Sequence, residues 1–103
     1  MDDALKDFYE VDRTIHEPAR LMLMALLYNV SSADFLYLLG ETGLTKGNLS
    51  SHLSKLEAAG YVAIDKGFVD KMPRTTCRLT PQGRQAFDNY RQQMRNGLAA
   101  AGS

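Results

Sequence analysis

The fold of this 103-residue chain is decided by the stretch Leu44-Thr-Lys-Gly-Asn-Leu-Ser-Ser-His-Leu-Ser-Lys-Leu-Glu-Ala-Ala-Gly-Tyr61. Three leucines, Leu49, Leu53 and Leu56, stand at i, i+4 and i+7 in this stretch. This spacing predicts one apolar stripe along a helix. Thr45 is a suitable N-cap residue, and Gly60 stands where a helix C-cap glycine belongs. The sequence therefore predicts a helix that begins after Thr45 and ends near Gly60.

The face opposite the leucines is small, polar and free of acidic residues. It consists of Gly47, Asn48, Ser51, Ser54 and Lys55. A helix that only faces water usually mixes glutamate with lysine. A helix that lies in a DNA groove needs hydrogen-bond donors and acceptors, little bulk, and no carboxylate to repel phosphate. This face therefore favours a helix that contacts nucleic acid.

The charge of the chain is unevenly distributed, although its formal net charge is zero. Residues 1–43 hold eight acidic and three basic side chains, whereas residues 44–84 hold three acidic and seven basic ones. The basic half thus contains the polar helix, where phosphate neutralisation would need it. Chance segregation in a small protein is the alternative explanation.

The composition indicates one domain of a cytoplasmic protein that does not contact membranes. No basic segment precedes an apolar run at the N-terminus, and the apolar run 21–28 is too short to cross a bilayer. The lone Cys77 indicates a reducing compartment, and its alternating surroundings favour a half-buried strand residue over a redox sensor.

Neither an enzyme nor a bound cofactor is expected. The sequence has no phosphate-binding Gly-x-x-x-x-Gly-Lys loop and no Gly-x-Ser-x-Gly elbow. His16-Glu17 is followed by Pro18 and not by a helical His-Glu-x-x-His, and one cysteine with two distant histidines cannot build a thiolate metal site.

Three helices are expected before the decisive one, over residues 3–13, 18–29 and 35–39. Pro18 suits the first turn of the second, which is apolar almost all round and should be buried on several sides. Either Ser32 or Asp34 could cap the third, which Gly40 and Gly43 end. A helix, a tight turn containing glycine and a second helix form the helix-turn-helix pattern.

Beyond Gly60 the period changes from 3.6 to 2, which predicts strands over residues 61–64 and 75–79. The segment 66–74 between them, bracketed by Gly67 and Pro73, is expected to be a loop too long for a tight hairpin. Thr80-Pro81 starts a last helix that should end near Asn96. The prediction is a mainly α fold with a small β-hairpin, one domain over residues 1–96, and a frayed tail over 97–103.

Three segments give this pattern a family resemblance: residues 15–21, 44–62 and 74–84. They resemble, in order, the first helix, the recognition helix and the second wing strand of small MarR- and ArsR-type regulators of bacteria and archaea. The resemblance covers residues 15 to about 90. It implies a winged helix-turn-helix of order α-α-α-α-β-wing-β-α.

The resemblance also implies how double-stranded DNA would be bound. The recognition helix would enter the major groove, using Thr45, Lys46, Asn48, Ser51, His52 and Lys55, and the wing would add Lys71 and Arg74. Because this helix contains no arginine, bidentate reading of guanine is unavailable to it. The role of His52 is left open by the sequence. Because His52 adjoins the leucine stripe, it either packs against another helix or contacts bases.

The family further implies a homodimer formed by the terminal helices. Its expected contacts are Leu5, Phe8, Tyr9, Phe87, Tyr90 and Met94. Two-fold symmetry predicts a near-palindromic operator with half-sites one helical turn apart, and the protein is expected to be a repressor. A small-molecule effector is compatible with this class but is not identified by any residue. The alternative is a winged helix that binds another protein and not DNA.

Overall fold

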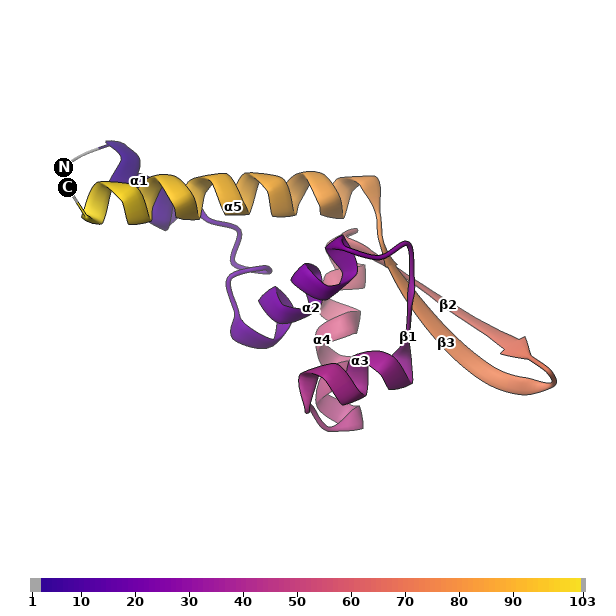
Figure 1. The fold of residues 1–103 in the computed structure, drawn as a ribbon. Helices are drawn as coiled ribbons and strands as arrows, with labels where there is room; N and C mark the ends of the chain where they lie inside the picture. The colour runs from indigo at the N-terminus through magenta and orange to yellow at the C-terminus, as the bar shows by residue number, and fades with distance from the viewer. Residues whose placement is uncertain (1–2, 103) are drawn as a thin grey trace.

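The computed structural model describes residues 3–102, so residues 1–2 and 103 of the predicted domain and tail lie outside it. The described chain forms α1 (Asp3–Glu10), α2 (Pro18–Tyr28), β1 (Ala33–Asp34), α3 (Phe35–Thr42), α4 (Lys46–Ala58), β2 (Val62–Val69), β3 (Met72–Leu79) and α5 (Pro81–Ala101). Helices α2, α3 and α4 cluster beside the β2–β3 hairpin, and α5 leads away from them with α1 at its far end (Figure 1). The predicted winged helix is confirmed.

Strand β1 was not predicted, and it completes a three-stranded antiparallel sheet of order β1-β3-β2. It is only two residues long, too short for an alternating pattern to be visible in the sequence. Ala33 of β1 pairs with Cys77 of β3, and Cys77 is buried. Burial is the main cause that raises the pKa of the Cys77 thiol to about 11. Asp34 is the cap of α3, because its Oδ1 accepts from the Leu36 N–H at 2.7 Å.

The prediction of a long loop in the wing is wrong. Strands β2 and β3 are each eight residues long and are joined by a two-residue turn, Asp70-Lys71, with φ of 52° and 67°. Both values are left-handed and resemble the I′ turn, which usually uses Asn-Gly. Pro73 pairs with Phe68 one step beyond the turn-closing pair, a position where proline costs no ladder hydrogen bond.

The predicted leucine stripe is confirmed as part of the hydrophobic core. The side chains of Leu49, Leu53 and Leu56 are buried together with Ile15, Leu23, Met24, Leu27 and Leu38. Thr45 caps α4 as expected, since its Oγ1 accepts from the Asn48 N–H at 3.1 Å. Helix α4 is thereby fixed in rotation, and its polar face points away from the core.

Helix α5 is longer than predicted and reaches Ala101, so the expected end near Asn96 is wrong. Gly97 is buried, and a Cβ placed on it would lie 2.5 Å from the Phe8 ring, which shows how closely α1 packs on this part of α5. That packing supplies contacts that the sequence of the tail does not reveal. Among residues 3–102, no helix has the length and apolar character needed to cross a membrane.

Gly83 is where α5 approaches the start of the wing. A Cβ at this position would lie 2.1 Å from the carbonyl oxygen of Tyr61, which is backbone and cannot turn aside. We expect Gly83→Ala to lower the free energy of unfolding by about 3 kcal/mol, measured by chemical denaturation. Gly40→Ala is the matched control, because nothing lies within 4 Å of its Cβ. It should raise stability by roughly 0.5–1 kcal/mol, and equal effects of the two changes would contradict the close approach.

Candidate nucleic-acid interface

The outward face of α4 is exposed along its whole length. The exposed residues between its cap and Lys55 include the predicted Lys46, Asn48 and Ser51, together with Gly47, Ser50 and Ser54. None of these side chains is acidic, and most are small, so the helix backbone can approach another surface closely. The structure therefore presents the predicted polar face to the outside.

His52 does not belong to that face. Its side chain is largely buried, with Nδ1 3.2 Å from Arg20 Nη1 and 3.4 Å from Glu17 Oε2. Glu17 in turn caps α2, accepting from the backbone N–H groups of Ala19 and Arg20. Of the two roles left open by the sequence, the structure favours packing, and His52 links α4 to the start of α2.

Glu17 is ionised at this contact. Burial alone would raise the pKa of the Glu17 carboxyl. The hydrogen bonds from the Arg20 and Ala19 N–H groups, together with the charges of His52 and Arg20, outweigh burial. The pKa of Glu17 is therefore lowered below its usual value. A carboxylate thus sits between Arg20 and His52 and does not face outward with the polar residues of α4. The negative charge of Glu17 is therefore paired within the protein.

The two predicted wing residues have different surroundings. Lys71 is exposed at the turn, whereas Arg74 Nε lies 3.2 Å from Asp34 Oδ2 and so ties β3 to the N-terminus of α3. Asp34 therefore serves both as the cap of α3 and as the partner of Arg74. Arg74 positions the wing, and its side chain is still about half exposed.

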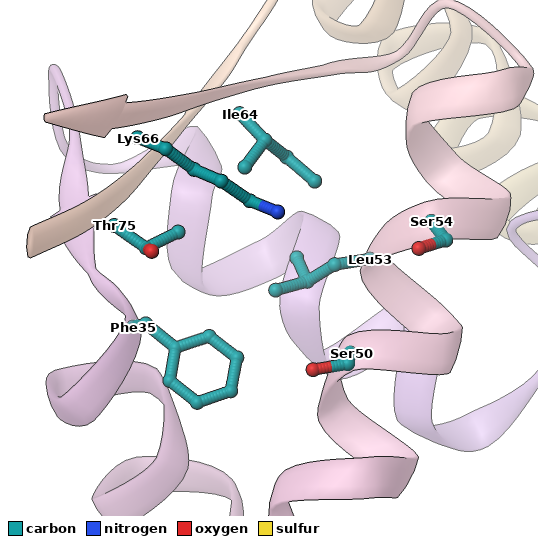
Figure 2. Close-up of a pocket in the computed structure, with 7 residues that line it drawn as sticks. All are labelled: Phe35, Ser50, Leu53, Ser54, Ile64, Lys66 and Thr75. Carbon is teal, nitrogen blue, oxygen red and sulfur yellow. The ribbon is translucent and has the colours of Figure 1, made fainter.

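A hollow of about 250 Å³ separates α4 from the wing. It is lined by Phe35, Ser50, Leu53, Ser54, Ile64, Lys66 and Thr75. Figure 2 shows an apolar floor of Phe35, Leu53 and Ile64, with the Lys66 ammonium extending across it toward α4. The sequence placed Lys66 in the loop expected between the two strands. Its spacing of two from Ile64 would have placed it on the inner strand face, had the strand been extended beyond Ile64.

A second, shallower hollow lies against α4 near its C-terminal end. Its lining includes three basic residues, Arg13, Arg20 and Lys55, together with Thr14, Ala58 and Ala59. Arg20 Nε donates to the Thr14 carbonyl, which holds the segment before α2 in place. Arg13 was not predicted as a site residue, because the sequence placed it at the end of α1 and far from α4. Cationic side chains thus line hollows on both the wing side and the α2 side of α4.

Two of the predicted dimer contacts are buried within a single chain. Phe87 packs on Tyr28 with ring centroids 5.3 Å apart, and the Tyr90 hydroxyl lies 2.9 Å from His16 Nδ1. Both side chains stabilise the contact of α5 with α2 and the segment before it, which accounts for their apolar character without a second subunit. Leu5, Phe8 and Met94 are half-buried, whereas Tyr9 is 74% exposed and Leu98, which the sequence assigned to the frayed tail, is 61% exposed.

The sequence matches a family of DNA-binding domains, and the fold matches solved structures of transcriptional regulators. The sequence model of a family described as the winged helix DNA-binding domain matches residues 19–98. A protein of Methanocaldococcus jannaschii described as uncharacterised is 41% identical over 71 residues, 69% of this chain and 77% of that protein. A transcriptional regulator homologue from Pyrococcus horikoshii superposes with a TM-score of 0.87 at 26% identity, covering 93% of this chain and 97% of the other.

The fold also extends to a protein of Enterococcus faecalis described as a transcriptional regulator of the MarR family. Its TM-score is 0.76 at 24% identity, covering 98% of this chain and 90% of that one. This chain belongs to the winged helix DNA-binding domain family. It is a small DNA-binding transcriptional regulator of MarR-like fold and not an enzyme.

Lys71 offers a test that separates folding from binding. Its φ of 67° is a conformation that costs a residue with a side chain about 1–2 kcal/mol and costs glycine little. We expect Lys71→Gly to be about 1 kcal/mol more stable than Lys71→Ala in denaturant unfolding. Both variants remove the same charge, so both should weaken DNA binding equally. A less stable glycine variant would contradict the left-handed turn.

Proposed function

We propose that this protein is a homodimeric repressor that binds a near-palindromic operator through α4 in the major groove. The observation that carries the proposal is the exposed, acid-free face of α4, with cationic side chains in the hollows on either side of it. A helix fits the major groove, which is about 12 Å wide, and small side chains on its outer face let it enter deeply. The flanking cations would then meet the two phosphate strands that border the groove.

Base reading is assigned to Asn48 and Ser51. Asparagine can bind adenine through two hydrogen bonds, and serine can donate to or accept from several base edges. Lys46 and Lys55 are exposed on the same helix and supply charge, whereas His52 is engaged with Glu17 and Arg20 and is withdrawn from this role. The absence of arginine from α4 favours adenine-containing half-sites over guanine-rich ones.

The position of α1 supports DNA as the partner. Its acidic residues, Asp3, Asp7 and Glu10, lie at the far end of α5, away from α4 and the wing (Figure 1). The acidic side chains of α1 are therefore separated in space from α4, and Glu17 and Asp34, which lie near α4 and the wing, are paired with Arg20 and Arg74. A duplex on the α4 face would avoid the acidic side chains of α1.

Dimerisation is assigned to the α1–α5 arm. The arm makes the molecule elongated, with principal extents of 58 × 25 × 21 Å, and it leaves Tyr9 and Leu98 exposed near its end. A two-fold contact of arms would cover these side chains and set two copies of α4 to read neighbouring half-sites. Occupation of such an operator would block access to a promoter that overlaps it.

DNA binding is tested by its salt dependence. Binding of wild-type protein to genomic fragments should weaken steeply with salt, and Lys66→Ala should reduce the log–log slope by about 0.9, the value of one phosphate contact. Lys6→Ala on α1 is the matched control and should leave the slope unchanged. Asn48→Ala should instead reduce discrimination between operator and variant sequences by about 1–3 kcal/mol.

The competing function is a winged helix that binds a protein partner. It predicts no salt-sensitive binding to any genomic duplex, and the same α4 variants would then disrupt a protein complex only. A Lys6→Ala effect equal to that of Lys66→Ala would also contradict the assigned face, because it would show that only total charge matters.

The dimer is tested with exposed residues of the arm. Tyr9→Asp combined with Leu98→Asp should shift the protein to monomers in light scattering at micromolar concentration, because a charge would be buried in the contact. Tyr37→Asp, an exposed tyrosine on α3, is the control and should leave the mass unchanged. A wild-type monomer, or a dimer unaffected by the double change, would contradict this assignment. Tyr90→Asp is unsuitable, because Tyr90 is buried in the fold.

A further inference from the structure

The tip of the wing carries large apolar side chains that the protein itself does not cover. Phe68 is 76% exposed, Met72 is 67% exposed and Val69 is 44% exposed. Phe68 pairs with Pro73 and Val69 pairs with Met72 across the hairpin, so the last two residue pairs before the turn are both apolar. Because neighbouring pairs point to opposite faces of a hairpin, the tip is apolar on both faces.

Packing within the chain does not explain these residues. Phe68 lies on the strand face that carries Val62, Ile64 and Lys66, but it is four residues beyond Ile64, or roughly 13 Å along an extended strand. Ile64 lines the hollow beside α4, and Phe68, four residues further along the strand, is beyond the reach of the core. In Figure 1 the hairpin end projects from the body with no other element beside it.

The tip is continuous with the DNA-binding face. Along the inner face of β2, Lys66 faces α4 across the hollow, and Phe68 follows it toward the turn. The whole hairpin is net basic, with Lys66, Lys71, Arg74 and Arg78 against Asp65 and Asp70. With eight residues per strand, the hairpin is roughly 26 Å long. This length allows the tip to cross a phosphate strand beside the major groove and reach the next groove.

We propose that the wing tip is an apolar wedge, in which Phe68 and Met72 enter the minor groove and bend the operator. The inference rests on the proposed DNA binding by α4 and the wing. Apolar side chains such as Phe, Met and Pro unstack base steps from the minor groove and kink the duplex by about 20–90°. The charges of Asp70 and Lys71 cancel at the apex, so Lys66, Arg74 and Arg78 give the hairpin its net positive charge toward phosphate, and the two-residue turn keeps the tip narrow.

The wedge adds a form of sequence preference that requires no base-specific hydrogen bond. Pyrimidine–purine steps such as TA and CA/TG unstack most easily, so the free energy of bending depends on the step at the tip. Operators should therefore carry such a step on the outer side of each half-site. This preference would supplement the limited reading by an α4 that lacks arginine.

The test uses a duplex selected by the wild-type protein from a random-sequence pool, with a donor and an acceptor dye at its ends. Wild-type binding should increase energy transfer as the duplex bends, and 2-aminopurine placed at the outer pyrimidine–purine step should brighten as it unstacks. The double variant Phe68→Ala/Met72→Ala should lose both signals and bind about tenfold more weakly. Its salt slope should stay unchanged, because no charge is removed.

Controls separate the wedge from general effects of exposed apolar residues. Leu36→Ala on α3, where the leucine is 67% exposed, should keep both signals. Because Phe68 and Met72 are exposed, the double variant should keep the wild-type melting curve. Wild-type binding without bending or unstacking, or a double variant that retains both, would overturn the wedge and leave DNA binding intact.

Other outcomes assign the tip elsewhere. A double variant that changes the mass in light scattering, with the bend retained, would assign the tip to contact between copies of the chain and overturn the wedge. Failure of the wild-type protein to bind any duplex would instead overturn the proposed function, and the wedge with it. The two failures are thus distinguished by the wild-type binding curve.

Discussion

Burial of the leucine stripe on α4 sets the orientation of this helix and, through it, the outward surface of the domain. Leu49, Leu53 and Leu56 enter the core, which fixes the rotation of α4 about its axis and so decides which residues face outward. The contact of His52 with Glu17 and Arg20 fixes the same rotation from the α2 side. The polar face of α4 can serve as a binding surface only because the leucines on the opposite face pack into the core in one fixed orientation.

A second constraint is the junction between the body and α5. Gly83 lets α5 meet the Tyr61 carbonyl at close range, and the Tyr61 hydroxyl donates to Asp12, which also accepts from the Thr14 N–H. Burial, followed by the hydrogen bond and charge of Asp12, raises the pKa of Tyr61 to about 12. These contacts join α5, the segment before α2 and the start of the wing. A rigid junction of this kind would hold the proposed dimer arm at a fixed angle to α4, which the spacing of two half-sites requires.

The wing combines contacts that fix its position with a tip that is left uncovered. Arg74 anchors β3 to α3 through Asp34, and β1 adds a short third strand to the base of the hairpin. Beyond that base the hairpin stands alone, and its turn places Asp70 and Lys71 in left-handed conformations that favour glycine. Strain and exposed apolar area together are costly in a free protein. The proposed insertion of the tip into DNA would cover the exposed apolar area.

The sequence by itself determined the order of the helices, the leucine stripe, the Thr45 cap and the acid-free face of α4, because each depends on residues close together in the chain. It did not determine the length of the wing, since Gly67 and Pro73 are tolerated in strands once a partner strand fixes their register. Nor did it predict that α5 continues past Gly97, where contact with Phe8 supplies the support. Packing in the tertiary structure placed His52 against Arg20, set Lys66 and Arg13 in the hollows beside α4, and buried Phe87 and Tyr90 within one chain. Those assignments depend on residues distant in sequence, whose approach is decided by packing and not by local pattern.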